Sequence, residues 1–197
     1  MGTQAARWET RISSGGYPIL NGYRKKDTMK KIRGTFFILL AVLFSATGYS
    51  QLIKGTYAIK NVQTGLLLRI KDANKSNGTP LVTYTPQDWK CMTWNFRHVD
   101  GQTYQLENLL TGKTIQSTNQ TTSAGDALKQ QPISNTAIQQ YELIPEGKNE
   151  YLIKLKGTDL YITPSDDKGS VNTPVILSKK DGGKLQQWTI YEQHPEI

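Results

Sequence analysis

Few residues in this chain combine the type and the spacing that catalysis or metal binding requires. Ser165 and Lys168 match an S-x-x-K pattern typical of acyl-enzymes, but no S-D-N or K-T-G partner accompanies them. Residues 72–78 resemble a calcium loop, but the glycine stands at position 7 instead of 6. Position 12 is Thr83, where such a loop needs a bidentate glutamate. We therefore expect no catalysis, no metal site and no cofactor.

The other reactive side chains also lack partners for chemistry. Asp166 and Asp167 are adjacent, so along a strand they would face opposite sides. The two histidines, His98 and His194, belong to no catalytic motif. Cys91 is the single cysteine, which excludes an intrachain disulfide, and we expect a buried, unreactive thiol. These observations argue against an enzyme.

Charge is distributed unevenly along the chain. The net charge is +8, but residues 1–50 hold 8 Lys/Arg and 2 Asp/Glu, whereas residues 51–197 hold 16 and 14. The second part is close to neutral and contains no basic arm. We therefore expect no nucleic-acid partner.

The basic first part contains a pattern typical of export. A cationic stretch at 29–33 precedes an apolar run at 36–44, which is followed by the small residues Gly48 and Ser50. The apolar run of about nine residues is too short to span a membrane, since a helix needs about 20. Residues 29–50 are therefore predicted to be a signal peptide.

The position of Met29 at the start of this segment determines how residues 1–28 are interpreted. With Met29 as the true start, residues 1–28 are a non-native or disordered extension; the alternative is a signal with a long basic region. Cleavage before Gln51 would release residues 51–197. We expect a secreted or periplasmic protein with no membrane insertion after signal removal.

Residues of matching type recur along the chain at a spacing of 47 without gaps. The apolar sets are Tyr57, Tyr104 and Tyr151; Ile59, Leu106 and Ile153; Leu68, Ile115 and Ile162; and Trp94, Tyr141 and Trp188. The turn sets are Gly65, Gly112 and Asp159, and Gly78, Gly125 and Asn172, all residue types that tolerate positive φ. The repeats span about 52–98, 99–145 and 146–192. A fixed period of this length indicates that the fold is built from repeated structural units.

Each repeat has the pattern of short strands separated by turns. In the first, alternating residues and turn dipeptides predict strands near 55–61, 66–71, 80–85 and 92–98. No segment has the apolar stripe of an amphipathic helix. Three pseudo-symmetric four-stranded repeats of 47 residues that share a core predict an all-β protein, a β-trefoil. A three-bladed propeller is the rival, but propellers typically have four to eight blades.

The last strand of each repeat begins with a characteristic triplet. These triplets are Met92-Thr93-Trp94, Gln139-Gln140-Tyr141 and Gln186-Gln187-Trp188. They resemble the Q-x-W repeat of the ricin-type β-trefoil lectin family, intact once and altered twice. The segment Asn77-Gly78-Thr79-Pro80-Leu81 is also similar to the entry to the third strand in that family. The resemblance covers residues 52–191.

The resemblance implies carbohydrate binding in shallow pockets, up to one per repeat. In such lectins an Asp on the second strand, an aromatic residue on the third and an Asn before the Q-x-W contact the sugar. Here the Asp position holds Arg69, Gln116 and Thr163; the Asn position holds Cys91, Ile138 and Leu185; the aromatic position holds Tyr84, Gln131 and Ser178. The first repeat is therefore the favoured site. Its expected contacts are Tyr84 as the stacking platform, with Arg69, Asp72, Asn74 and Trp89 nearby.

Two functions follow from the resemblance. The first is a secreted, non-catalytic carbohydrate-binding module that recognises a glycan or polysaccharide weakly. The alternative is a trefoil that binds a surface protein, as an inhibitor or adhesin, because the usual Asp and Asn sugar contacts are replaced. Fold alone does not decide between them.

Overall fold

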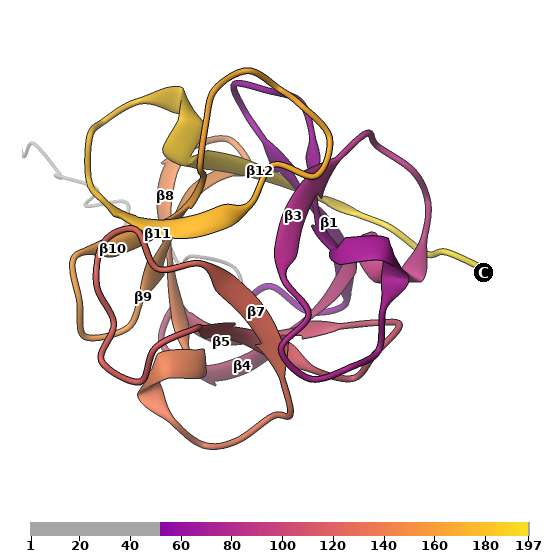
Figure 1. Cartoon of the computed structure of the whole chain (residues 1–197), viewed down its shortest axis with the longest axis horizontal. Helices are drawn as coiled ribbons and strands as arrows, with labels where there is room; N and C mark the ends of the chain where they lie inside the picture. The colour runs from indigo at the N-terminus through magenta and orange to yellow at the C-terminus, as the bar shows by residue number, and fades with distance from the viewer. Residues whose placement is uncertain (1–51, 197) are drawn as a thin grey trace, which may run out of the picture. The chain divides into compact units, whose positions relative to one another are not determined.

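The computed structural model describes residues 52–196 and consists of twelve short strands. Figure 1 shows them as three lobes around a common centre. The strands of the first repeat are β1 (Thr56–Asn61), β2 (Leu67–Ile70), β3 (Leu81–Tyr84) and β4 (Thr93–Asp100). The second has β5 (Thr103–Asn108), β6 (Thr114–Ser117), β7 (Leu128–Gln131) and β8 (Tyr141–Gly147), and the third has β9 (Glu150–Leu155), β10 (Leu160–Pro164), β11 (Val175–Lys179) and β12 (Gln187–Glu192). The predicted β-trefoil of three four-stranded repeats is confirmed.

The first and last strands of the three repeats form a closed barrel. Antiparallel pairing runs from β1 to β4, β5, β8, β9 and β12, and returns from β12 to β1. In the closing pair, Ile59 lies opposite Ile190 and Asn61 opposite Trp188. Closure removes the exposed sheet edges that an open six-stranded sheet would have.

The second and third strands of each repeat form a hairpin, and the three hairpins meet on the threefold axis. The hairpins are β2–β3, β6–β7 and β10–β11. At the centre, where Figure 1 shows β3, β7 and β11, each hairpin donates one backbone N–H to the next: Gly78 to the carbonyl oxygen of Gln130 (2.9 Å), Gly125 to Leu177 (2.8 Å) and Asn172 to Thr83 (2.8 Å). The three donors have φ of 78°, 94° and 63°, which explains why only glycine and asparagine occupy this turn position.

The core repeats with the same symmetry. Trp94, Tyr141 and Trp188 are fully buried, as predicted. Each donates its polar hydrogen to a backbone carbonyl of the second strand 26 residues earlier: Trp94 Nε1 to Leu68, Tyr141 Oη to Ile115 and Trp188 Nε1 to Ile162. Burial raises the pKa of Tyr141, so its hydroxyl stays neutral and can donate. The aromatic residue therefore fills the core and fixes the second strand at the same time.

One predicted turn position differs in the third repeat. Gly65 and Gly112 have positive φ as expected, but Asp159 does not, and Gly157 takes that conformation instead. The physical reason is the residue that ends the first strand. In the first two repeats an asparagine there accepts hydrogen bonds from the turn, whereas Leu155 has no such side chain and the third turn closes differently.

Four three-residue 3-10 turns complete the described chain. They are η1 (Lys71–Ala73), η2 (Lys90–Met92), η3 (Ala137–Gln139) and η4 (Lys184–Gln186), of which the last three each lead into the fourth strand of a repeat. Within residues 52–196, no helix is long and apolar enough to cross a membrane. The predicted extension at 1–28 and signal peptide at 29–50 lie outside the described residues.

Candidate functional site

Three of the five predicted site residues lie together in the first repeat. Arg69 is on β2 and Tyr84 ends β3, and the hairpin register places Leu67 opposite Tyr84 and Arg69 opposite Val82. Trp89 immediately precedes η2, which packs against β2. The β2–β3 hairpin and the turn into β4 therefore bring Arg69, Tyr84 and Trp89 to one place.

Arg69 interacts with both aromatic rings. Its guanidinium carbon lies 4.1 Å from the Tyr84 ring centroid and 5.8 Å from the Trp89 ring centroid. The two ring centroids are 6.2 Å apart and the planes are inclined by 34°. Such cation–π contacts contribute about 0.5–2 kcal/mol each. Tyr84 thus supports the guanidinium with one face of its ring, while Trp89 remains 37% exposed.

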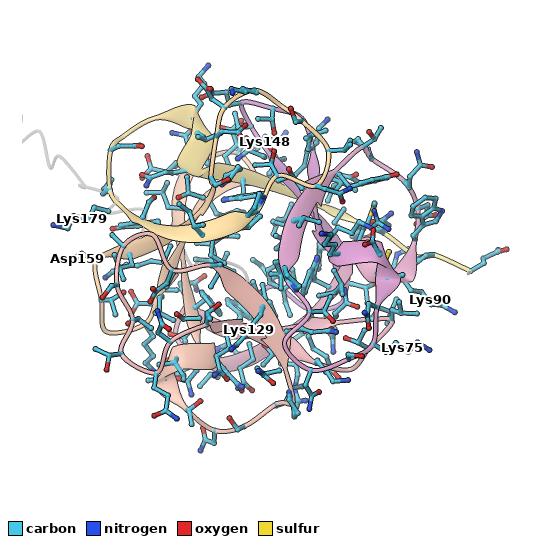
Figure 2. All side chains as sticks on the ribbon, in the orientation of Figure 1. Lys75, Lys90, Lys129, Lys148, Asp159 and Lys179 are labelled. Atoms are coloured by element: carbon cyan, nitrogen blue, oxygen red, sulfur yellow. The ribbon has the colours of Figure 1, made fainter. Side chains whose placement is uncertain are left out.

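A pocket of about 230 Å³ opens beside these side chains. It is lined by Arg69, Ala73, Trp89, Lys90, Cys91 and Leu110. Figure 2 shows Lys90 on the outer side of the first repeat. Sequence reasoning missed Lys90, Ala73 and Leu110 as lining residues. Ala73 and Lys90 adjoin predicted residues in the chain, whereas Leu110 comes from the second repeat and reaches the pocket only through the fold.

Of the five predicted residues only Arg69 and Trp89 line the pocket; Tyr84, Asp72 and Asn74 do not. Asp72 is exposed in η1 with φ of 53°. Asn74 Oδ1 accepts the Ser76 N–H at 2.8 Å, which makes a local turn, and the Asn74 carbonyl accepts Gln130 Nε2 at 2.7 Å. These contacts give Asn74 a structural role in joining the first hairpin to the second repeat. The amide oxygen of Asn74 is therefore already engaged by the chain.

Arg69 has an unusual electrostatic environment. Its side chain belongs to a residue only 8% exposed, yet its Nε is buried without a hydrogen-bond acceptor. Among residues 52–196, no carboxylate lies within 4 Å of its guanidinium. Burying an unpaired charge is costly, and the aromatic contacts offset only part of that cost. Arg69 also lines the pocket, so a ligand there meets a guanidinium that no carboxylate of residues 52–196 pairs.

In the second repeat, the polar groups at the equivalent position form hydrogen bonds within the protein. Gln116, which corresponds to Arg69, accepts Gln139 Nε2 at 2.8 Å. The same Nε2 donates to the Pro132 carbonyl at 2.9 Å, and Gln139 Oε1 accepts the Ser134 N–H at 2.7 Å. The glutamine of the Q-x-W triplet therefore holds the loop after β7 and also satisfies the second strand.

The third repeat has the same arrangement with shorter side chains. Gln186 Nε2 donates to Ser178 Oγ and to the Lys179 carbonyl, both at 2.7 Å, while its Oε1 accepts the Asp181 N–H at 2.9 Å. Ser178 in turn lies 2.6 Å from Thr163 Oγ1, the residue that corresponds to Arg69. The polar groups at this position again bond to one another.

The first repeat cannot form this network, because Met92 replaces the glutamine. Met92 is fully buried and packs with Ala58, Leu67 and Cys91. Its thioether does not offer the donors and acceptor of an amide. The substitution leaves Arg69 without an internal acceptor. The neighbouring Cys91, which lines the pocket, is buried as predicted.

Two larger hollows lie at the ends of β1 and β12. One of about 560 Å³ is lined by residues that include Lys54, Tyr57, Tyr151 and Glu192. The other, of about 510 Å³, lies between residues 86–88 and the C-terminal residues 191–194. Neither contains a buried cation without a partner. Among the described residues, no three His, Cys, Asp or Glu side chains gather as a metal site.

Comparison with known proteins confirms the family resemblance. Residues 90–178 match the family model described as ricin-type beta-trefoil lectin domain-like. No curated protein sequence matches the chain.

Solved structures share the fold at low sequence identity. A designed threefold-symmetric protein, ThreeFoil, is 23% identical with a TM-score of 0.68, over 70% of this chain and 99% of its own. A ricin B-like lectin of Macrolepiota procera, solved with lactose, is 22% identical with a TM-score of 0.60, over 74% of this chain and 99% of its own. An exo-β-1,3-galactanase of Clostridium thermocellum is 18% identical with a TM-score of 0.65, over 69% of this chain but only 30% of its own. These similarities establish the β-trefoil fold.

Proposed function

We propose that this protein is a non-catalytic carbohydrate-binding module that holds one sugar residue in the pocket of the first repeat. The observation that carries the proposal is that one pocket is lined by a partly exposed Trp89 and by Arg69, whose guanidinium forms no ion pair with a described residue. A sugar ring presents an apolar C–H face and a set of hydroxyl groups. An aromatic platform next to a hydrogen-bond donor complements both.

The size of the pocket suits a small ligand. Its volume of about 230 Å³ is below the roughly 300–1,000 Å³ of pockets that enclose drug-sized molecules. We infer that it accommodates a single sugar residue of a longer glycan. Trp89 is the better stacking platform of the two aromatic residues, because Arg69 already covers one face of Tyr84.

The repeats differ in their capacity to bind. In the second and third repeats the corresponding polar groups bond to one another, and Gln131 and Ser178 replace the aromatic residue. One working pocket gives no avidity from multiple sites. We therefore propose weak recognition by a single site.

The proposal includes export and the absence of catalysis. The signal-like segment at 29–50 supports a secreted or periplasmic location. The pocket offers a guanidinium, an ammonium, an indole and a buried thiol, but no carboxylate pair for glycosidic bond cleavage. A protein-binding role remains the alternative function, favoured by exposed apolar side chains such as Val99, Leu109 and Tyr191.

A glycan array tests the proposal. The full chain is screened beside Trp89→Ala and a matched control, Tyr191→Ala, which removes another exposed aromatic side chain away from the pocket. We expect binding that is lost in Trp89→Ala and retained in Tyr191→Ala. Loss in Tyr191→Ala alone would place the site at the hollows beside β12. No binding by a folded sample, together with a stable protein complex in pull-downs, would support the alternative.

A further inference from the structure

We infer that the pocket of the first repeat selects an acidic sugar, one that carries a carboxylate or a sulfate, over its neutral counterpart. This inference rests on the proposed function and specifies its ligand class. The starting observation is that β2 contributes the guanidinium of Arg69 to the wall of the pocket. A site built on a carboxylate accepts hydrogen bonds from hydroxyls, whereas a guanidinium only donates.

The charge around the pocket favours an anion. The pocket is lined by the two cationic side chains Arg69 and Lys90 and by no acidic side chain. The acidic residues closest in sequence, Asp72 and Asp88, form no ion pair within 4 Å with any described residue. Both cations thus lie in the wall of the pocket and both carboxylates lie outside it, which favours an anionic group on the ligand.

The burial of Arg69 makes the expected preference large. Its guanidinium is held in place by the Tyr84 and Trp89 rings, so little side-chain entropy remains to be lost on binding. No carboxylate of the described residues pairs with this guanidinium, so a ligand acceptor would not have to displace one. A planar carboxylate can accept two parallel hydrogen bonds from a guanidinium, and a sulfate offers the same donors a set of oxygens. A neutral hydroxymethyl group cannot accept in this way.

The geometry also explains how selectivity would coexist with stacking. Trp89 and Leu110 form the apolar part of the pocket wall, and Arg69 and Lys90 form the polar part. A sugar whose C–H face contacts Trp89 could direct the acidic group of the same ring, or of the neighbouring one, toward Arg69. Neutral sugars would keep the stacking contact and lose the ionic one.

The test compares ligands that differ only in the acidic group. The full chain is titrated calorimetrically with a galacturonate trisaccharide and a galactose trisaccharide, and separately with galactose 6-sulfate and galactose. We expect the acidic member of at least one pair to bind about 10- to 100-fold more tightly, which is the range of a charge-assisted hydrogen bond. The two pairs distinguish a carboxylate from a sulfate. The preference should shrink at high salt because the ligand charge remains partly exposed.

Substitutions assign the effect to Arg69. Arg69→Met should abolish the preference and leave residual stacking affinity, while Arg69→Lys should retain part of it, since lysine keeps the charge and loses the fork of donors. Lys148→Met is the matched control: it removes one positive charge from an exposed position in the third repeat and should leave the preference intact. If the Arg69 variants do not fold, the Arg69 Nε–H signal of the wild-type protein is followed by NMR during the same titrations.

The outcomes separate this inference from the proposed function. Equal affinity for acidic and neutral sugars, with both lost in Trp89→Ala, would overturn the acidic preference and leave the sugar-binding proposal standing. An acidic preference that survives in Arg69→Met would also overturn the inference. Absence of any binding would overturn both. A shift of the Arg69 signal with the galacturonate trisaccharide but not with the neutral one would support the inference without a variant.

Discussion

The first repeat has the same strand arrangement as the other two but differs from them at the first residue of the Q-x-W triplet. In the second and third repeats a buried glutamine, Gln139 or Gln186, holds the loop after the third strand and bonds to side chains of the hairpin. In the first repeat Met92 takes that place and Arg69 is left without an acceptor. The comparison shows that exchanges at two positions, 69 and 92, distinguish the first repeat from the two whose polar groups bond to one another.

The difference also changes what holds the loop at 85–88. In the second and third repeats the corresponding loop backbone donates to the oxygen of the glutamine amide. In the first repeat the loop is held from outside, because Gln193 Nε2 donates to the Gln87 carbonyl at 2.7 Å. The C-terminal residues thus supply a contact that the triplet no longer makes.

The largest change in unfolding free energy is expected from removing the buried glutamine of a Q-x-W triplet. Gln186→Leu leaves the Asp181 N–H without its acceptor and deprives Ser178 and the Lys179 carbonyl of a donor, so it should cost about 2–4 kcal/mol of unfolding free energy. Met92→Leu is the matched change in the first repeat and should cost under about 1.5 kcal/mol. Urea denaturation measures both. Equal costs would mean that the glutamine does not distinguish the repeats.

A double-mutant cycle sharpens the comparison. Met92→Gln alone places an amide in an apolar cluster and should cost about 1–3 kcal/mol. Combined with Arg69→Gln, it recreates the pair formed by Gln116 and Gln139, and we expect about 1 kcal/mol of favourable coupling. Denaturant midpoints of the four proteins give the coupling. Strictly additive costs would show that the hairpin of the first repeat cannot adopt the closed arrangement.

A smaller effect is expected at the external contact to the loop. Gln193→Ala removes the donor to the Gln87 carbonyl and should cost about 1 kcal/mol. Amide hydrogen exchange should accelerate in residues 85–89 but not in the corresponding loop near Ser134, which keeps its own glutamine. Equal acceleration in both loops would indicate general destabilisation and contradict the local role of Gln193.

The smallest effect is expected at the turns on the threefold axis. Asn172→Gly makes the third turn like those at Gly78 and Gly125 and should change the unfolding free energy by no more than about 0.5 kcal/mol. Asn172→Val is the control; a β-branched residue at φ of 63° should cost at least about 1–2 kcal/mol. Thermal melting compares the two. A large cost for the glycine variant would show that the asparagine side chain itself matters.

The fold could be predicted from the sequence because the same residue pattern occurs in three repeats. Each strand, core aromatic and axial turn is predicted by residues that recur at one spacing, and agreement among three copies outweighs any single ambiguous segment. The turn at Asp159 was predicted wrongly because the cause lies four residues earlier, at Leu155. A substitution of the capping residue moves the positive φ to another position.

The site was less predictable, for a physical reason. The chain pattern places Arg69, Tyr84 and Trp89 in one region, but it does not show that Arg69 covers Tyr84 or that Trp89 stays exposed. It also does not reveal Leu110, which reaches the pocket across the seam with the second repeat. The absence of an acceptor for Arg69 depends on every neighbour in space, so it becomes visible only in three dimensions.

The pairing of β1 with β12 has a consequence for the order of folding. These strands lie at opposite ends of the described chain, yet they form five consecutive residue pairs that complete the barrel. Bringing such distant segments together carries a loop-closure entropy that nearer pairings do not. The barrel therefore cannot close until residues 187–192 have been synthesised. Until then the first strand of the barrel keeps one edge without its final partner.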